Sequence, residues 1–215
     1  MTSATIGAAT AQGQPPKRIG VFGGAFDPPH VAHLAIAKAA LEQLDLDLLL
    51  VIPTGQAWHR ASATSDAVHR LAMAYMAFAD LERVQIEDIE IRRTGPSYTV
   101  DTLLELRQRH IGAEWLLVLG ADQAQKLSHW QRWQELLALA SISVAGRDGQ
   151  LTPANQDIAA QHAKAQGRWH DLRLPAMQVS ATEVRRRVAA YEDISGLVPE
   201  GIARYIAQHK LYQAH

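Results

Sequence analysis

Short apolar runs alternate with segments of helical periodicity along most of the chain. Apolar runs of about four to eight residues that stop at glycine, proline or polar residues are typical of buried strands. We expect strands at residues 18–22, 46–52, 84–91, 115–119, 141–144 and 169–174. Other segments repeat apolar residues every three or four positions, as amphipathic helices do. We expect helices at residues 30–44, 66–80, 97–110, in a region up to about 139, at 153–166, and from 180 and 199 onward.

This order of elements predicts the fold class. Repeated strand-helix-strand units favour a parallel sheet with helices on both faces. The prediction is therefore an α/β protein with a Rossmann-like, open and mostly parallel sheet. Residues 1–17 are small and polar and are expected to form a flexible N-terminal tail. Residues 18–215 contain no repeat, low-complexity tract or linker, so we expect one domain there.

Composition removes several classes of function. The chain has 47% hydrophobic and 20% charged residues, as in ordinary globular proteins. Its 21 Lys and Arg against 22 Asp and Glu give no basic field that would hold nucleic acid. The absence of cysteine excludes disulfides and thiolate chemistry and fits a cytoplasmic location. No apolar run suits a signal peptide or a membrane span, so we expect neither membrane nor nucleic acid as a partner.

The turn after the first predicted strand carries the most specific chemistry. In an open parallel sheet this turn is the usual phosphate cradle. Gly23 and Gly24 would let backbone N–H groups approach a phosphate, and the following helix adds the positive end of its dipole. His30 and His33, three residues apart, would share a helix face beside the same anion. Neither the G-x-G-x-x-G fingerprint nor the P-loop G-K-[ST] is present.

Two plainer interpretations of this turn stay open. The glycines could serve turn geometry alone, with Pro28 and Pro29 for rigidity and two partly buried histidines bonded to the backbone. A zinc site is a weaker alternative, because no third ligand follows at helical spacing and cysteine is absent. We therefore predict no metal site built by the protein itself.

A second segment places hydroxyl and guanidinium groups at a predicted helix start. Ser180 and Glu183 have the spacing of a capping box, which is a sufficient structural explanation for both. Thr182 and Arg185 could instead present their polar groups to a phosphate at the helix N-terminus. The neighbouring arginines at 186 and 187 are expected to be solvated.

Together these segments resemble the nucleotidyltransferase superfamily, which has a Rossmann-like fold. Residues 24–33 read G-x-F-D-P-x-H-x-x-H, and residues 180–185 read S-x-T-x-x-R. The resemblance implies that the two histidines bind triphosphate oxygens and stabilise charge on the α-phosphate and the departing pyrophosphate. The family carries isoleucine and a second hydroxyl residue where Val179 and Ala181 stand. The implied catalytic residues are His30, His33 and Arg185, and the implied ATP-binding residues are Gly23, Gly24, Ala25, Phe26, Ser180, Thr182 and Arg147.

The middle of the chain indicates the acceptor. Residues 96–103, P-S-Y-T-V-D-T-L, and residues 120–123, G-A-D-Q, followed by Trp130, resemble bacterial nicotinate-nucleotide adenylyltransferases. The resemblance implies that amides near Tyr98 bind the pyridine carboxylate, that Trp130 stacks near the ring, and that Asp122 lies on a ribose or on the metal-nucleotide side. The implied substrate-binding residues are Ser97, Tyr98, Thr99, Asp122, Trp130, His59 and Arg60.

Each of these residues also has a structural explanation. Ser97 or Thr99 could cap a helix, and Asp122 has capping-box spacing to the glutamine at 125. Trp130 and Trp133 could both be core aromatics.

One loop departs from the resemblance. Many members carry P-P-H-K after the second strand, whereas residues 53–60 read P-T-G-Q-A-W-H-R. His59 keeps its place, and Arg60 replaces a phosphate-binding lysine by charge but not by shape. Arg147, after the fifth predicted strand, is implied near the adenine or the phosphates, and a solvated arginine is an equal alternative.

The resemblance implies one reaction and leaves alternatives. Nicotinate mononucleotide and ATP would give nicotinate adenine dinucleotide and pyrophosphate, with Mg²⁺ carried on ATP. Apart from the resemblance, we expect a monomer or small homo-oligomer. One alternative is an adenylyl- or cytidylyltransferase acting on nicotinamide mononucleotide or another phosphorylated acceptor. A non-enzymatic alternative is a nucleotide-binding regulator.

Overall fold

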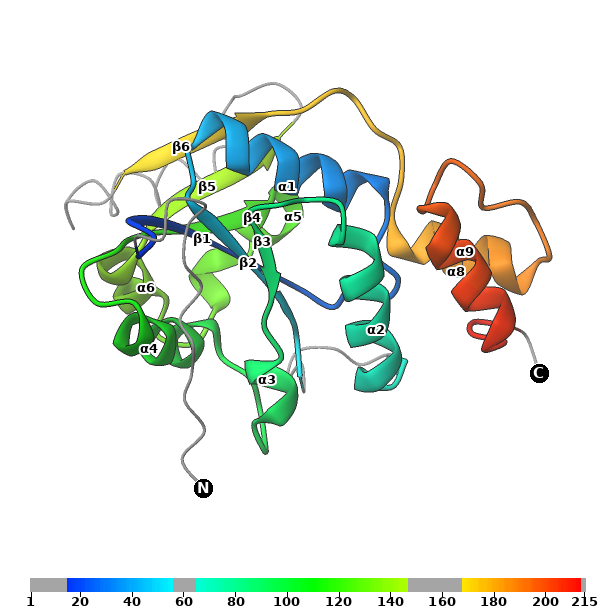
Figure 1. Cartoon of the computed structure of the whole chain (residues 1–215), viewed down its shortest axis with the longest axis horizontal. Helices are drawn as coiled ribbons and strands as arrows, with labels where there is room; N and C mark the ends of the chain where they lie inside the picture. The colour runs from blue at the N-terminus through cyan, green and yellow to red at the C-terminus, as the bar shows by residue number, and fades with distance from the viewer. Residues whose placement is uncertain (1–14, 56–64, 147–167, 214–215) are drawn as a thin grey trace.

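The strands of the computed structural model form one parallel sheet (Figure 1). The structure describes residues 15–55, 65–146 and 168–213. Within these residues the sheet has six strands in the order β3-β2-β1-β4-β5-β6, every neighbouring pair parallel. This is the strand order of dinucleotide-binding folds and confirms the predicted fold class. The strands are β1 (Arg18–Gly24), β2 (Leu48–Pro53), β3 (Val84–Ile86), β4 (Glu114–Gly120), β5 (Ser141–Gly146) and β6 (Trp169–Arg173).

Helices cover both faces of the sheet and bury two separate apolar clusters. On β1, Phe22 faces one cluster while Ile19 and Val21 face the other, as side-chain alternation in a strand requires. One face carries α1 (Val31–Gln43), α2 (Ala67–Phe78), α8 (Ala181–Ala189) and α9 (Glu200–Gln208). The other carries α3 (Ile89–Arg92), α4 (Thr99–Arg109), α5 (Ala121–Ala124), the 3₁₀ turn η1 (Leu127–His129) and α6 (Trp133–Leu139).

The predicted strand at residues 84–91 is wrong beyond its first three residues. Only Val84–Ile86 pairs with β2, and the chain then turns into the short helix α3. This helix buries Ile89 in the core cluster and Glu90 beside α4. The apolar pattern beyond Ile86 therefore reflects burial of residues in α3 and not a continuation of the strand. The helix predicted at residues 153–166 lies outside the described residues.

The site lies where the sheet extends to both sides of its central strand, β1. From β1 the chain passes to β2 on one side, and β4 pairs on the other side. The turns that follow β1 and β4 therefore leave in different directions from the same edge of the sheet. In such sheets ligands bind in the crevice at this point, beyond the carboxyl ends of the strands.

Gly55 is required by a close backbone approach just after β2. A Cβ at this position would collide with the Glu90 carbonyl oxygen and lie 2.8 Å from Ser97 Oγ. We expect Gly55→Ala to lower the free energy of unfolding by about 1–3 kcal/mol, because a backbone atom must shift to admit the methyl group. Urea denaturation measures this change.

Gly201, in α9, provides the matched control. A Cβ there would meet open space, so Gly201→Ala should leave stability unchanged or raise it by up to about 1 kcal/mol. An equal loss of stability in both variants would contradict the close approach at Gly55.

Candidate active site

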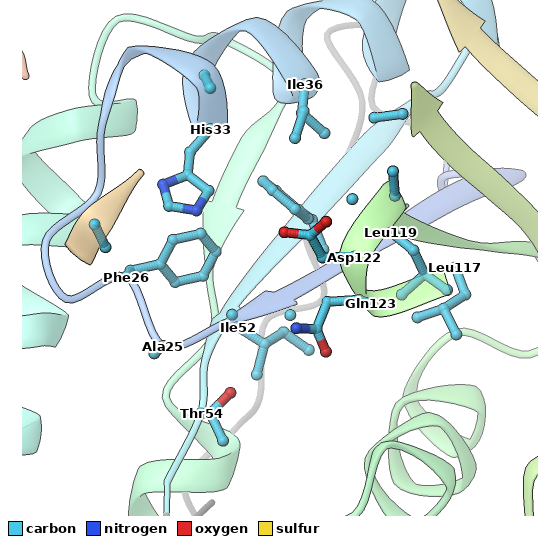
Figure 2. Close-up of a pocket in the computed structure, with 18 of the residues that line it drawn as sticks. Ala25, Phe26, His33, Ile36, Ile52, Thr54, Leu117, Leu119, Asp122 and Gln123 are labelled. Atoms are coloured by element: carbon cyan, nitrogen blue, oxygen red, sulfur yellow. The ribbon is translucent and has the colours of Figure 1, made fainter. Parts of the chain in front are cut away.

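A cavity of about 450 Å³ opens at the carboxyl ends of β1 and β4. Figure 2 shows His33 from α1 beside the Phe26 ring, with Asp122 and Gln123 extending from α5 toward the same space. Thr182 and Arg185 are not among the lining residues, and His59, Arg60 and Arg147 lie outside the described residues. The predicted residues that line the cavity are Gly23, Gly24, Ala25, Phe26, His30, His33, Ser97, Tyr98, Thr99, Asp122, Trp130 and Ser180.

The two histidines converge at the N-terminus of α1, as their spacing predicts. Their rings are stacked, with centroids 3.7 Å apart and planes 21° apart. The backbone N–H of His30 donates to Nδ1 of His33 over 3.2 Å. Because a backbone N–H can only donate, His33 Nδ1 must carry a lone pair, which places the proton of the neutral ring on Nε2. This contact fixes both the tautomer and the orientation of His33.

Burial keeps both imidazoles neutral at neutral pH. It lowers the pKa of His30 to about 4. Burial also lowers the pKa of His33 well below its usual range, and the neighbouring His30 lowers it further. Within the described residues, His30 Nδ1 is buried without a hydrogen-bond partner. In the ligand-free protein the pair can therefore supply N–H donors to an anion, without a full positive charge on either ring.

Phe26 forms the wall behind His33. Its ring makes edge-to-face contacts with His33, Phe22 and Phe78, at centroid distances of 5.0, 5.5 and 5.8 Å. Gly24 lies against this ring, and a Cβ there would come within 3.1 Å of it. The phenylalanine of the motif thus holds the histidine side chain, and Gly24 is needed so that the wall can lie this close.

The second motif begins α8 and reaches the histidine loop through one arginine. Ser180 Oγ accepts the backbone N–H of Glu183 over 3.2 Å, so the predicted N-cap is confirmed. The Glu183 carboxylate pairs with Arg186 and Arg187, so the second half of the capping box does not form. Arg185 instead turns toward the loop, where its Nη1 donates to the Asp27 carbonyl oxygen over 2.7 Å.

The opposite side of the cavity is made by the starts of α4 and α5. Ser97 is buried and its Oγ donates to the Glu90 carbonyl oxygen over 3.5 Å. Tyr98 is the N-cap of α4, and its side chain makes no capping hydrogen bond, so the capping interpretations of Ser97 and Thr99 are wrong. Helix α5 starts after Gly120, so Asp122 does not cap it either. These polar groups therefore need another explanation than helix capping.

The two tryptophans of this side differ in their surroundings. Trp130 lines the cavity and also packs against the core, whereas Trp133 packs against the core and is not among the lining residues. Trp130 is therefore the tryptophan that a ligand in this cavity can contact.

Two buried charged side chains hold the cavity loops, and sequence reasoning missed both. Arg70 Nη1 donates to the carbonyl oxygens of Ala25 and Thr54, over 3.0 and 2.7 Å, and Nε donates to that of Ser65 over 3.0 Å. One guanidinium thus joins the turn after β1, the end of β2 and the start of α2. No local pattern around Arg70 indicates this role, because its partners come from three separate segments.

Glu90 is the second such residue. It lines the cavity, and Thr102 Oγ1 donates to its carboxylate over 3.0 Å. Burial raises the pKa of Glu90, although Thr102 and nearby arginines oppose the rise. An acidic residue inside the apolar pattern of residues 84–91, which predicted a strand, was the available signal.

A match to a family model identifies the class of protein to which this fold and site belong. A family model described as cytidylyltransferase-like matches residues 21–187, which include both motifs and the acceptor segment.

In the described residues no group of three or more His, Cys, Asp or Glu side chains is placed to hold a metal ion, and no helix is long and apolar enough to cross a membrane.

Curated relatives narrow the class. A protein of Albidiferax ferrireducens named "Probable nicotinate-nucleotide adenylyltransferase" is 53% identical over 198 residues, which cover 92% of this chain and 98% of the relative. A relative of the same name from Methylibium petroleiphilum is 39% identical, over 92% of this chain and 93% of its own length. The chain therefore belongs to the nicotinate-nucleotide adenylyltransferase family.

Solved structures agree with the fold. The Plasmodium falciparum nicotinic acid mononucleotide adenylyltransferase, described in complexes with APC and with NaAD, superposes with a TM-score of 0.73 at 17% identity. The match covers 91% of this chain and 97% of that one. At this identity the likeness concerns the chain fold alone.

The depressed pKa of His30 predicts a loss of stability in acid. In the unfolded chain this histidine takes up a proton near pH 6.5, but in the folded protein only near pH 4. The unfolded state therefore binds more protons between these values, and stability falls as pH falls through them. The His30 contribution to this loss is about 3 kcal/mol.

Denaturation at pH values from about 7.5 to about 4.5 measures this contribution. His30→Asn should flatten the decline relative to the wild type, because the titrating group is gone. The exposed His129 provides the control, and His129→Asn should keep the wild-type decline. A wild-type slope in His30→Asn would contradict the assignment.

Proposed function

We propose that the cavity is the active site for adenylyl transfer from ATP to nicotinate mononucleotide, giving nicotinate adenine dinucleotide and pyrophosphate. The observation that carries this proposal is the stacked histidine pair at the start of α1, in the same cavity as the starts of α4 and α5. Family membership supports the same reaction. The 5′-phosphate of the mononucleotide attacks the α-phosphorus of ATP and displaces pyrophosphate, without a covalent enzyme intermediate.

For this reaction the protein must align the two substrates and stabilise the negative charge that develops. A phosphate monoester is largely ionised at neutral pH, so the attacking oxygen needs no strong base. His30 and His33 donate N–H groups to the triphosphate, where negative charge develops on the leaving pyrophosphate. The positive end of the α1 dipole faces the same anion. Binding of the anion also favours protonation of the buried imidazoles, which strengthens the contact as charge grows.

The two motifs supply opposite sides of the ATP site. Backbone groups from Gly23 to Phe26 lie at the end of β1 and in the turn after it, and Ser180 lines the cavity from the start of α8. Arg185 and Thr182 lie just outside the lining, where Arg185 Nη2 donates to Thr182 Oγ1 over 3.3 Å. In this proposal the Arg185 guanidinium, which is bonded to the Asp27 carbonyl oxygen, also contacts the phosphates of ATP.

The acceptor lies against the starts of α4 and α5. The first N–H groups of α4 near Tyr98 bind the pyridine carboxylate, since helix N-termini carry unsatisfied donors. Trp130 contributes a stacking face and Asp122 an acceptor for ribose hydroxyls. The solved Plasmodium falciparum enzyme was described with NaAD bound, and a product of this kind joins the two substrate regions proposed here.

Other parts of the proposal rest on sequence. His59, Arg60 and Arg147 would contribute to substrate binding from segments outside the described residues. Mg²⁺ would enter on the ATP phosphates, because this ion keeps most of its waters and needs few protein ligands. The protein would act as a single domain over residues 18–215, as a monomer or small homo-oligomer, in the cytoplasm.

We expect His33→Ala to lower kcat by more than about 100-fold, because one oriented donor to the developing charge is lost. Pyrophosphate release with ATP and nicotinate mononucleotide measures the rate. The melting temperature shows that the fold is intact, and His129→Ala, on η1, serves as the control. Activity of His33→Ala within a few-fold of the wild type would rule out the proposed role of His33.

Acceptor choice gives a second prediction. N–H donors bind an anionic carboxylate more tightly than a neutral carboxamide. The kcat/KM for nicotinate mononucleotide should therefore exceed that for nicotinamide mononucleotide by about 10-fold or more. Equal values, or a preference for the amide, would contradict the placement of the carboxylate at the start of α4.

A further inference from the structure

The C-terminal part of the chain holds both ends of the histidine loop, residues 27–31. At the first end, the Tyr212 hydroxyl donates to Asp27 Oδ1 over 2.7 Å. At the other end, the Val31 backbone N–H donates to the Leu197 carbonyl oxygen over 2.9 Å. His30 lies between these two contacts, one residue before α1. The position of the proposed catalytic loop therefore depends on residues more than 160 positions away in the sequence.

Asp27 connects this loop to three other segments. The side chain is only 2% exposed. Its Oδ2 accepts the Ser65 backbone N–H over 3.2 Å, and its carbonyl oxygen accepts Arg185 Nη1 over 2.7 Å. A buried carboxylate is stable only while donors satisfy its oxygens. Loss of the donor from Tyr212 would therefore disturb the loop and, through the same residue, the placement of Arg185.

Tyr212 is suited to be a constant donor. Its half-buried ring packs against the core cluster of the α1, α2 and α9 face. Burial, together with the neighbouring Asp27, raises the pKa of its hydroxyl, which therefore stays protonated. Tyr212 and Lys210 adopt φ values of +63° and +50°. This left-handed conformation is uncommon for residues other than glycine and persists where surrounding contacts hold it.

We propose that Tyr212 is a positioning residue for adenylyl transfer, which acts by holding the Asp27 carboxylate and with it His30, His33 and Arg185. This inference rests on the proposed function of the cavity. Tyr212 is not among the residues that line the cavity, so its effect is on geometry, and small displacements of aligned groups cost large factors in rate.

Tyr212→Phe tests the proposal, because it removes one hydroxyl and keeps the ring. We expect kcat for pyrophosphate release to fall by about 10-fold or more, while KM for nicotinate mononucleotide changes by less than about twofold, because the starts of α4 and α5 are untouched. Rates are taken per folded molecule, well below the melting temperature. A kcat within twofold of the wild type would overturn the proposal.

Tyr205→Phe is the matched control. Tyr205 also belongs to the C-terminal part, but its hydroxyl pairs with His69 Nδ1 on α2, at 2.9 Å, and not with the loop. A general loosening of α9 would lower kcat in both variants, which would also overturn the proposal. We expect Tyr205→Phe to keep kcat within twofold while its melting temperature falls about as much as that of Tyr212→Phe.

Imidazole ¹⁵N spectra of the ligand-free protein separate this inference from the proposed function. Tyr212→Phe should shift the His33 resonances, because the His30 N–H that bonds its Nδ1 moves, whereas Tyr205→Phe should leave them unchanged. Unchanged His33 resonances in Tyr212→Phe would overturn the positioning role. Absence of pyrophosphate release in the wild type would contradict the proposed function, and these spectra would still decide whether Tyr212 orients the loop.

Discussion

The parallel pairing of β1 with both β2 and β4 is the constraint on which the site depends. Residues 19–24 of β1 align with residues 48–53 of β2, and residues 18–21 align with residues 114–117 of β4. The carboxyl ends of the strands therefore share one edge, and α1 and α5 begin there. This convergence brings the histidine pair and Asp122 into one cavity, although about 90 residues separate them in the sequence.

Buried polar groups then fix what the sheet brings together. Arg70 donates to backbone carbonyl oxygens of three separate segments and so joins them. Asp27 joins the histidine loop to α8 and to the C-terminal part of the chain. Each of these groups would be costly to bury without its partners. Because the partners come from different elements, the same hydrogen bonds that satisfy the charges also set the geometry of the loops. His30 and His33 are neutral because they are buried. Their N–H groups complete a site that can bind an anion.

Local patterns predicted the sheet well because buried parallel strands are continuous apolar runs. They failed at residues 84–91, where the chain leaves the sheet after Ile86 and forms a short helix that buries Glu90 beside Thr102. The motif residues were found because their spacing is short, as between His30 and His33. Arg70 and Tyr212 were missed because their contacts are long-range, as in the pair of Asp27 and Tyr212, which are 185 positions apart. Such contacts leave no periodic signal in one sequence.

A crystal structure of the protein with nicotinate adenine dinucleotide would locate both substrate regions at once. We expect the adenylate to lie over Gly23 and Gly24 with its phosphates at the histidine pair, and the pyridine ring to lie between Tyr98 and Trp130. Its carboxylate should accept N–H groups at the start of α4. A dinucleotide bound outside the crevice between β1 and β4, or with its phosphates away from His30 and His33, would contradict this placement.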